Sequence, residues 1–243
     1  MRTAAKPASL VAVVLATLAP ACMAPTEALP RAAAHWAQCL PCHGANGEGD
    51  IGQLAPAIAG LPAWYVDAQL FKFREGGRGA HFDDIAGLRM RPMALSLHSN
   101  DDVRDMAAYV AQLPTPATPL TITGGDAAAG KGHFALCAAC HGADGGGNEM
   151  MNAPPIAGRD DWYIYDQLRK FRSGVRGTHK LDTTGPGMRA IALSLPDDKA
   201  LRDVAHYIAE LPNAVTVRPA VVDAVPTDLD AAIKAVGAES KRP

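Results

Sequence analysis

The chain repeats itself once at a fixed distance along the sequence. Residues 35–114 align with residues 133–212 at a constant offset of 98 positions, and about 40 of the roughly 80 aligned pairs are identical. Two unrelated segments share far fewer identities, so the chain is a tandem duplication of one small domain. A domain of this size buries little apolar surface, and we expect a metal, a disulfide or a large cofactor to complete each core.

Composition excludes two broad classes of protein. The chain has 23 Lys and Arg residues against 25 Asp and Glu residues, a formal net charge of -2. It therefore lacks the basic excess with which nucleic-acid-binding proteins neutralise phosphates. Apolar residues make up 48% of the chain, which excludes wholesale disorder.

The first 21 residues have the pattern of an export signal. Arg2 and Lys6 precede an uncharged stretch, and small residues follow where a signal peptidase would cut. The stretch is shorter than the ~20 residues that span a bilayer, so we expect a periplasmic protein without a spanning helix. Cys22 comes directly after the candidate cleavage site, and acylation there would anchor the chain to a membrane. Ordinary cleavage is the alternative.

The repeat divides the rest of the chain. We expect an N-terminal linker over residues 22–30, a first domain over 31–114 and a second domain over 126–212. Residues 115–125 contain two prolines and read as a linker. Residues 213–243 form a tail rich in Ala, Val and Pro, whose role the sequence does not indicate.

Apolar residues at helical spacing predict the main elements of each copy. The last helix is marked by Val103, Met106, Val110 and Leu113, and by Leu201, Val204, Ile208 and Leu211. A middle helix is marked by Val66, Leu70 and Phe73, and by Ile164, Leu168 and Phe171. Ser99 or Asn100 and Asp197 are the expected N-caps of the last helices. Because no stretch alternates with a period of two, we predict an all-α fold with long loops.

Each copy carries one C-x-x-C-H motif, Cys39-Leu40-Pro41-Cys42-His43 and Cys137-Ala138-Ala139-Cys140-His141. This is the attachment pattern of haem c. Two thiols at this spacing each form a thioether with one porphyrin vinyl group, and the adjoining histidine then faces the iron. A third helix should lead into each motif. We therefore predict two covalently bound haem c groups, with iron ligated on one side by His43 and His141.

Two other uses of paired cysteines fit the sequence less well. A thioredoxin-type redox site requires a βαβ unit, and the chain shows no strand pattern. A zinc site shared by the two pairs would leave each following histidine unexplained and is rare in exported proteins.

The repeat offers three pairs of candidates for the opposite face of each iron: His35 and His133, His81 and His179, and Met90 and Met188. The first pair lies four residues before each motif, on the attachment helix, and is expected to pack or to contact propionates. Met93 aligns with Ile191, which cannot bind iron, and is excluded.

Met90 and Met188 are the favoured ligands. They lie about 50 residues after their cysteines, in what reads as a Gly/Pro-containing loop before the last helix that could fold over the ring. His81 and His179 stay open as alternatives and would give haems of lower potential. Methionine–histidine ligation raises the potential and leaves no open iron position, which suits electron transfer.

These features resemble the dihaem cytochromes of the c4 type, which join two class I cytochrome c domains. The resemblance covers residues 31–212 and rests on the paired motifs and on Met90–Leu97 and Met188–Leu195. In that family the axial methionine stands seven residues before the leucine that precedes the last helix, which again indicates Met90 and Met188. The resemblance implies two domains related by a pseudo-twofold axis, each wrapped around a covalent haem.

The resemblance also implies supporting residues. Pro56–Gly60 and Pro154–Gly158 match a family segment whose proline carbonyl accepts a hydrogen bond from the proximal histidine, so Pro56 and Pro154 would orient His43 and His141. Four arginines retained by the repeat are candidates for the domain interface or for neutralising propionates, solvated helix ends being the alternative: Arg74, Arg172, Arg78 and Arg176.

We expect an exported electron carrier of a respiratory chain, with no catalytic residue. Its partners would be a redox protein that donates electrons, such as a quinol-oxidising complex, and an acceptor such as a terminal oxidase. One alternative is a dihaem peroxidase or thiosulfate-oxidising enzyme; the latter type uses a cysteine as a distal ligand, and neither copy has a spare one. The other is a haem subunit of a larger oxidoreductase complex, which would associate with a membrane through its partner.

Overall fold

A computed structural model describes residues 28–213. The signal peptide expected over residues 1–21, Cys22, and the tail beyond Asn213 lie outside the described residues. Within residues 28–213 the chain forms nine α-helices and two short 3-10 helices and no strand, only isolated bridges. The predicted all-α class is confirmed.

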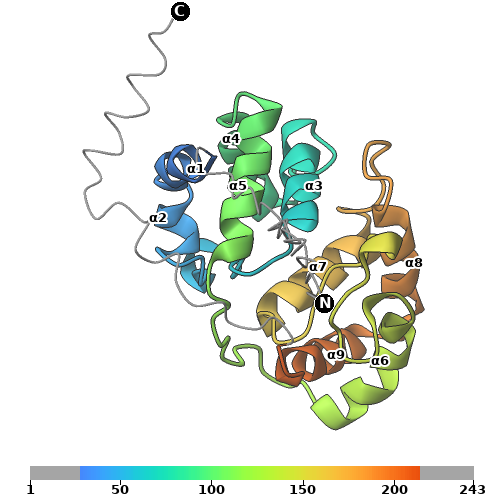
Figure 1. The fold of residues 1–243 in the computed structure, drawn as a ribbon. Helices are drawn as coiled ribbons and strands as arrows, with labels where there is room; N and C mark the ends of the chain where they lie inside the picture. The colour runs from blue at the N-terminus through green and yellow to red at the C-terminus, as the bar shows by residue number, and fades with distance from the viewer. Residues whose placement is uncertain (1–27, 214–243) are drawn as a thin grey trace, which may run out of the picture.

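The helices form two lobes (Figure 1). The first lobe contains α1 (Ala28–Trp36), α2 (Leu40–His43), η1 (Ile51–Gln53), α3 (Ala63–Arg74), α4 (Ile85–Leu95) and α5 (Asn100–Gln112). The second contains α6 (Ala127–His141), η2 (Glu149–Met151), α7 (Asp161–Ser173), α8 (Gly185–Ser194) and α9 (Asp198–Glu210). Each lobe has its own apolar core. The duplication in sequence is therefore a duplication of domains.

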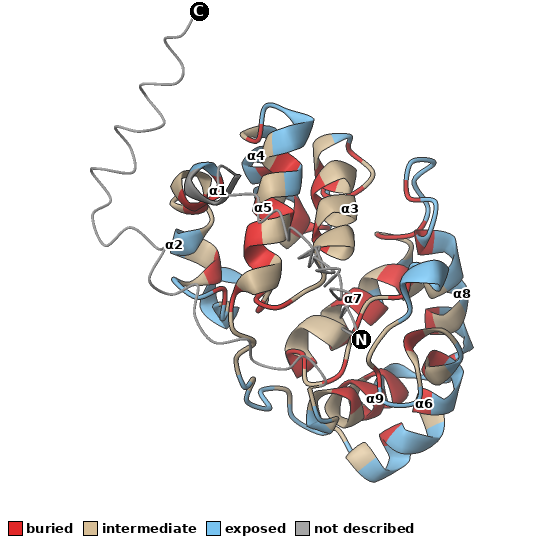
Figure 2. Ribbon diagram, in the orientation of Figure 1, coloured by how far each residue is buried: buried red, intermediate tan, exposed pale blue. Residues whose placement is uncertain are grey.

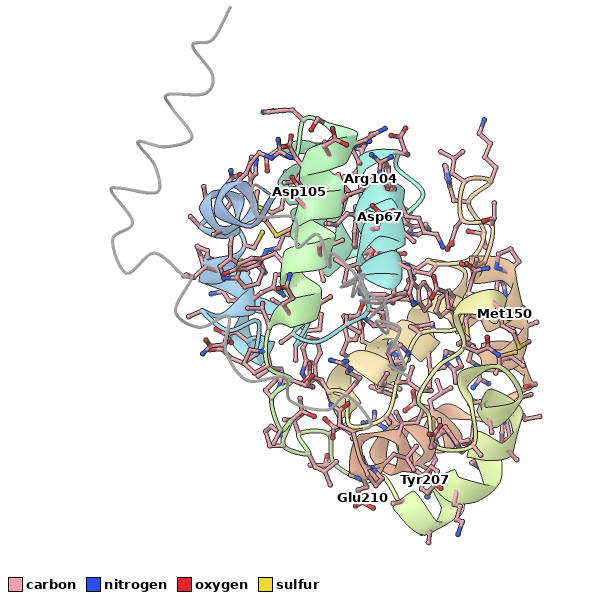
Figure 3. All side chains as sticks on the ribbon, in the orientation of Figure 1. Asp67, Arg104, Asp105, Met150, Tyr207 and Glu210 are labelled. Atoms are coloured by element: carbon pink, nitrogen blue, oxygen red, sulfur yellow. The ribbon has the colours of Figure 1, made fainter. Side chains whose placement is uncertain are left out.

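The last helix of each domain is the centre of its core. Buried residues concentrate on α5 and α9 (Figure 2). In the first domain α1 and α3 pack on α5, and in the second α6 and α7 pack on α9. An ion pair between Arg31 and Asp105 also joins α1 to α5. Asp105 is labelled in Figure 3.

The expected helix caps are confirmed. The Ser99 side chain accepts the Asp102 N–H while the Asp102 carboxylate accepts the Ser99 N–H, a reciprocal capping box at the start of α5. Asp197 accepts the Ala200 N–H at the start of α9. The middle helix α7 ends at Gly174, whose φ of 86° is left-handed.

The segments that carry Met90 and Met188 are helices, so the predicted loop is wrong. Met90 lies in α4, which contains Pro92, and Met188 lies in α8, where a proline occupies the first turn. A proline in the first turn of a helix lacks an N–H that would be unpaired anyway, so it favours a helix start. In α4 the Asp84 side chain caps the helix by accepting the Gly87 N–H, and the helix continues through Pro92.

Candidate haem sites

Each motif histidine is fixed by one carbonyl. The Nδ1 atom of His43 lies 2.9 Å from the Pro56 oxygen, and that of His141 lies 2.7 Å from the Pro154 oxygen. A carbonyl only accepts hydrogen bonds, so Nδ1 carries the proton and Nε2 keeps its lone pair. Burial lowers the pKa of both imidazoles against the opposing effect of these bonds, which favours the neutral ring that binds metals.

The first thiol of each motif has a raised pKa. Burial, reinforced by the neighbouring Cys42, raises the pKa of Cys39 to about 12. Burial also raises the pKa of Cys137 to about 11. Redox-active C-x-x-C pairs instead have lowered thiol pKa values, so the electrostatics disfavour a thioredoxin-type site.

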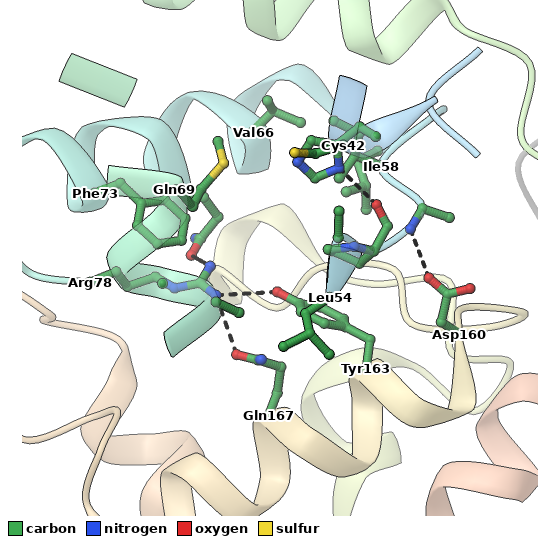
Figure 4. A pocket seen from close by; sticks show the side chains of 18 of the residues that line it. Cys42, Leu54, Ile58, Val66, Gln69, Phe73, Arg78, Asp160, Tyr163 and Gln167 are labelled. Atoms are coloured by element: carbon green, nitrogen blue, oxygen red, sulfur yellow. Dashed lines mark hydrogen bonds between the residues drawn. The ribbon is translucent and has the colours of Figure 1, made fainter. Parts of the chain in front are cut away.

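An apolar cavity of about 190 Å³ adjoins the first motif. It brings Met90 to the motif residues Cys39, Cys42 and His43, although Met90 follows them by about 50 residues in the sequence. The walls are largely apolar and come from both domains (Figure 4). A planar apolar ring with one polar edge suits such walls, so the residues present fit a haem.

The methionine and histidine candidates for the second iron ligand lie in different surroundings. Met90 and Met188 are partly buried against the cores of their domains. His81 and His179 instead lie in loops, where each Nδ1 accepts a nearby backbone N–H. In the first domain His81 does not line the cavity, whereas Met90 does. Met93 lies at the cavity with its side chain more exposed.

The remaining histidine pair lies away from the cavity. Nε2 of His35 is 3.5 Å from the Asp102 carboxylate of α5. Its counterpart His133 is half-buried on α6. His35 does not line the first-domain cavity and contacts α5 instead, while the packing role expected for His133 stays a prediction.

The four repeated arginines fall into two groups. Arg74 bonds the carbonyl oxygens of Leu97 and Ser99, and Arg172 bonds that of Pro196, so this pair ties the middle helix to the start of the last helix. Arg78 and Arg176 are buried between the domains and bond Gln69 and Gln167, respectively.

Arg78 crosses the junction between the domains. Its Nη2 lies 3.2 Å from both the Tyr163 hydroxyl and the Gln167 Oε1 of α7. The Nε atoms of Arg78, Arg159 and Arg176 are buried without a hydrogen-bond partner. Buried guanidinium groups with unused donors suit carboxylates, so this cluster fits haem propionates.

A reciprocal pair of ion pairs joins the two domains. Lys72 of α3 lies 2.6 Å from Asp182, and Lys170 of α7 lies 2.9 Å from Asp84. The Asp84 carboxyl is buried, yet its hydrogen bond with Lys170 and the charge of that lysine keep its pKa below the ordinary value. Sequence reasoning missed these residues, although the repeat retains both the lysine and the aspartate at the 98-residue offset.

The second domain sends two further charged residues to the first-domain cavity. Arg159 bonds the Ala59 oxygen at 2.9 Å, and Asp160 accepts the Ala57 N–H at 2.7 Å. Sequence reasoning missed both. The available signal was a break in the repeat, because Leu61 and Pro62 stand at these positions in the first copy.

Two helical domains, each with a C-x-x-C-H histidine oriented by a proline carbonyl, define a c-type cytochrome with two covalent haem groups. A family model described as cytochrome c matches residues 31–114 and 127–212. The chain belongs to the cytochrome c family, in a dihaem arrangement of the c4 type, and it functions as an electron carrier.

Relatives share this two-domain arrangement. The chain is 33% identical over 184 residues to a thiosulfate dehydrogenase electron acceptor of Stutzerimonas stutzeri strain A1501, a match that covers 71% of this chain and 78% of the relative. The crystal structure of reduced recombinant cytochrome c4 from Pseudomonas stutzeri matches with a TM-score of 0.60 and 27% identity, over 74% of this chain and 96% of that one.

A third match is to part of a larger protein. The thiosulfate dehydrogenase TsdBA from Marichromatium purpuratum matches with a TM-score of 0.64 and 28% identity, over 79% of this chain but 43% of that chain. Among residues 28–213 no helix combines the length and apolarity that crossing a membrane requires.

Proposed function

We propose that each haem would be held by the two cysteines and the histidine of one motif and by one methionine outside it. Cys39 and Cys42 form the thioethers of the first haem, and His43 and Met90 ligate its iron. The corresponding residues of the second haem are Cys137, Cys140, His141 and Met188. The observation that carries this assignment is the cavity that brings Met90 to the first motif, together with the repeat of the same residues in the second domain.

The bound haems supply reversible one-electron transfer between ferric and ferrous iron. The chain holds each motif histidine in one tautomer through Pro56 or Pro154, and the apolar walls of the first-domain cavity would keep water from its haem. Met90 and Met188 would supply a thioether ligand to the iron. Arg78 and Arg176 offer charge and donors to the propionates between the domains. This arrangement serves outer-sphere transfer, so no residue acts as an acid, base or nucleophile.

The donor we propose is a thiosulfate-oxidising dehydrogenase, and the acceptor is a terminal oxidase. The support is similarity to a relative described as a thiosulfate dehydrogenase electron acceptor, and to part of TsdBA. A catalytic role for this chain is the second candidate, favoured by the same TsdBA match. The carrier is preferred because the four cysteines among residues 28–213 all belong to the haem motifs, which leaves none to act as a distal ligand.

Stopped-flow spectroscopy tests this proposal. When a thiosulfate dehydrogenase and thiosulfate are added together, both haems of the ferric protein should be reduced on the time scale of stopped-flow mixing. Thiosulfate alone, or peroxide added to the ferrous protein, should give no turnover above that of free haem. Turnover without the dehydrogenase would establish the enzyme instead.

We also propose export to the periplasm after removal of residues 1–21, with residues 31–114 and 126–212 as the two domains and 115–125 as their linker. The support is the charged-then-apolar start of the sequence and the absence of helix between Leu113 and Gly125. Mass spectrometry of the mature N-terminus tests both cleavage and acylation of Cys22. An acylated cysteine would show membrane anchoring, and an unmodified mature terminus would exclude it.

A further inference from the structure

A carboxylate of the second domain reaches the backbone behind the first motif histidine. The Oδ2 atom of Asp160 accepts the Ala57 N–H at 2.7 Å, in a buried position next to the cavity. Figure 4 labels Asp160 and marks its bond with a dashed line. The neighbouring Pro56 oxygen accepts from Nδ1 of His43. The two bonds lie on opposite ends of one peptide group.

That shared peptide group links the carboxylate to the histidine. The Pro56 carbonyl and the Ala57 N–H belong to the same amide, and a negative acceptor on the N–H increases the negative charge on the carbonyl oxygen. The oxygen then accepts more strongly from Nδ1 of His43, which lies 2.9 Å away. A stronger bond at Nδ1 makes the imidazole a more basic ligand through Nε2.

The second domain cannot form the same link. Its aligned peptide joins Pro154 to Pro155, and Pro155 has no N–H to donate. The position that aligns with Asp160 is Pro62, which has no carboxylate. His141 therefore keeps its carbonyl bond at 2.7 Å without a charged group behind it.

We propose that Asp160 is a positioning residue that tunes the first-domain haem from the second domain. This inference rests on the proposed ligation of that haem by His43. Through the Pro56–Ala57 peptide, Asp160 makes His43 a stronger donor to iron, which stabilises the ferric state and lowers the reduction potential of the first haem alone. Docking of the two domains thereby sets a difference between two sites that the repeat makes alike.

The neighbouring Arg159 separates this route from a simple effect of charge. Arg159 bonds the Ala59 oxygen, lines the same cavity, and interacts electrostatically with Asp160. The positive and negative side chains oppose each other in the field that they exert at the cavity. The hydrogen bond through the amide has no such opposing partner.

A double-mutant cycle on the holoprotein tests the route. Asp160→Asn keeps an acceptor oxygen but removes the charge. Ala57→Pro removes the N–H, and the backbone already accommodates a proline at the aligned position in the second domain. Redox titration gives the two potentials, and NMR of the ferric protein gives the hyperfine-shifted ring protons of His43 and His141.

Asp160→Asn should raise the potential of the first haem and shift the electron distribution between the haems toward it by several-fold. The His43 resonances should move and those of His141 should stay. In the Ala57→Pro background the same substitution should have little further effect. An equal shift in both backgrounds, or no shift, would overturn the proposal. If the parent protein shows no His43 resonances typical of an iron ligand, the proposed ligation itself fails, which is a separate outcome.

Discussion

The two domains reach their motifs by different backbone routes. In the second domain α6 runs unbroken from Ala127 through the whole motif, whereas in the first the helix stops at Trp36 and resumes as α2 at Leu40. Pro41 stands where the second copy has Ala139, and it lacks the N–H that would bond the carbonyl four residues earlier. In the first turn of α2 that N–H is not needed, so the helix restarts just before Pro41. Even so, the two histidines bond equivalent proline carbonyls, that of Pro56 for His43 and that of Pro154 for His141. The histidine–carbonyl bond, and not helix continuity, is what the duplication has kept.

The junction between the domains combines symmetric and asymmetric contacts. The pairs of Lys72 with Asp182 and of Lys170 with Asp84 obey the repeat. The contacts of Arg159 and Asp160 run in one direction only, from the second domain to the first. Symmetric contacts hold the domains together, and the asymmetric ones give the two sites different surroundings.

The largest expected effect comes from removing one attachment site. Replacing Cys137 and Cys140 together by alanine should leave one haem per chain and unfold the second domain, because a domain this small needs the ring to complete its core. Replacing Cys39 and Cys42 should do the same to the first domain. Haem content per protein and intact mass measure the result, and a double variant that retains two haems would contradict the assignment.

The interface pairs should differ in strength despite their symmetry. Asp182→Asn leaves Lys72 with Thr184 as its remaining described partner, and should destabilise the protein by about 3–5 kcal/mol. Asp84→Asn should cost less, because Lys170 keeps Asp166 at 2.6 Å.

Chemical denaturation of the holoprotein measures both interface variants. Asp101→Asn is the matched control, since its pair with Arg104 is exposed and should contribute at most about 1 kcal/mol. Equal losses for Asp182→Asn and Asp84→Asn would show that the second partner of Lys170 does not matter.

Exchanging proline and alanine between the two motifs should affect the two domains unequally. Ala139→Pro removes a hydrogen bond inside α6 and should destabilise the second domain by about 3 kcal/mol. Pro41→Ala in the first domain should change stability by about 1 kcal/mol or less. Thermal unfolding followed by circular dichroism measures both, and an equally small effect of Ala139→Pro would mean that α6 tolerates the break.

The smallest expected effect concerns the caps of the last helices. Ser99→Ala and Asp197→Ala each remove a side chain that accepts a backbone N–H, and each should cost about 1 kcal/mol. Denaturant midpoints at constant slope measure the loss. A loss confined to one variant would show that the two last helices do not begin in equivalent ways.

Local signals predicted much of the fold and of the candidate site. The repeat predicted two domains, the family resemblance predicted the bonds of Pro56 and Pro154 to the motif histidines, and side-chain chemistry predicted the Ser99 and Asp197 caps. The haem attachment residues stay a prediction of the motif. The Met90 and Met188 segments were misread because prolines that fit inside or begin a helix resemble loop signals. The break in the repeat marks Asp160 as different, but its partner could not be predicted because Ala57 lies 103 residues away in the chain.

The far-red absorption of the purified ferric protein tests directly whether methionine binds both irons. Methionine bound to ferric haem c gives a weak charge-transfer band there, and its intensity can be calibrated per haem. We expect a band equivalent to two methionines, reduced by half in Met90→Leu and by half in Met188→Leu. Absence of the band, or a high-spin signature at either haem of the parent protein, would contradict a carrier with two histidine–methionine sites.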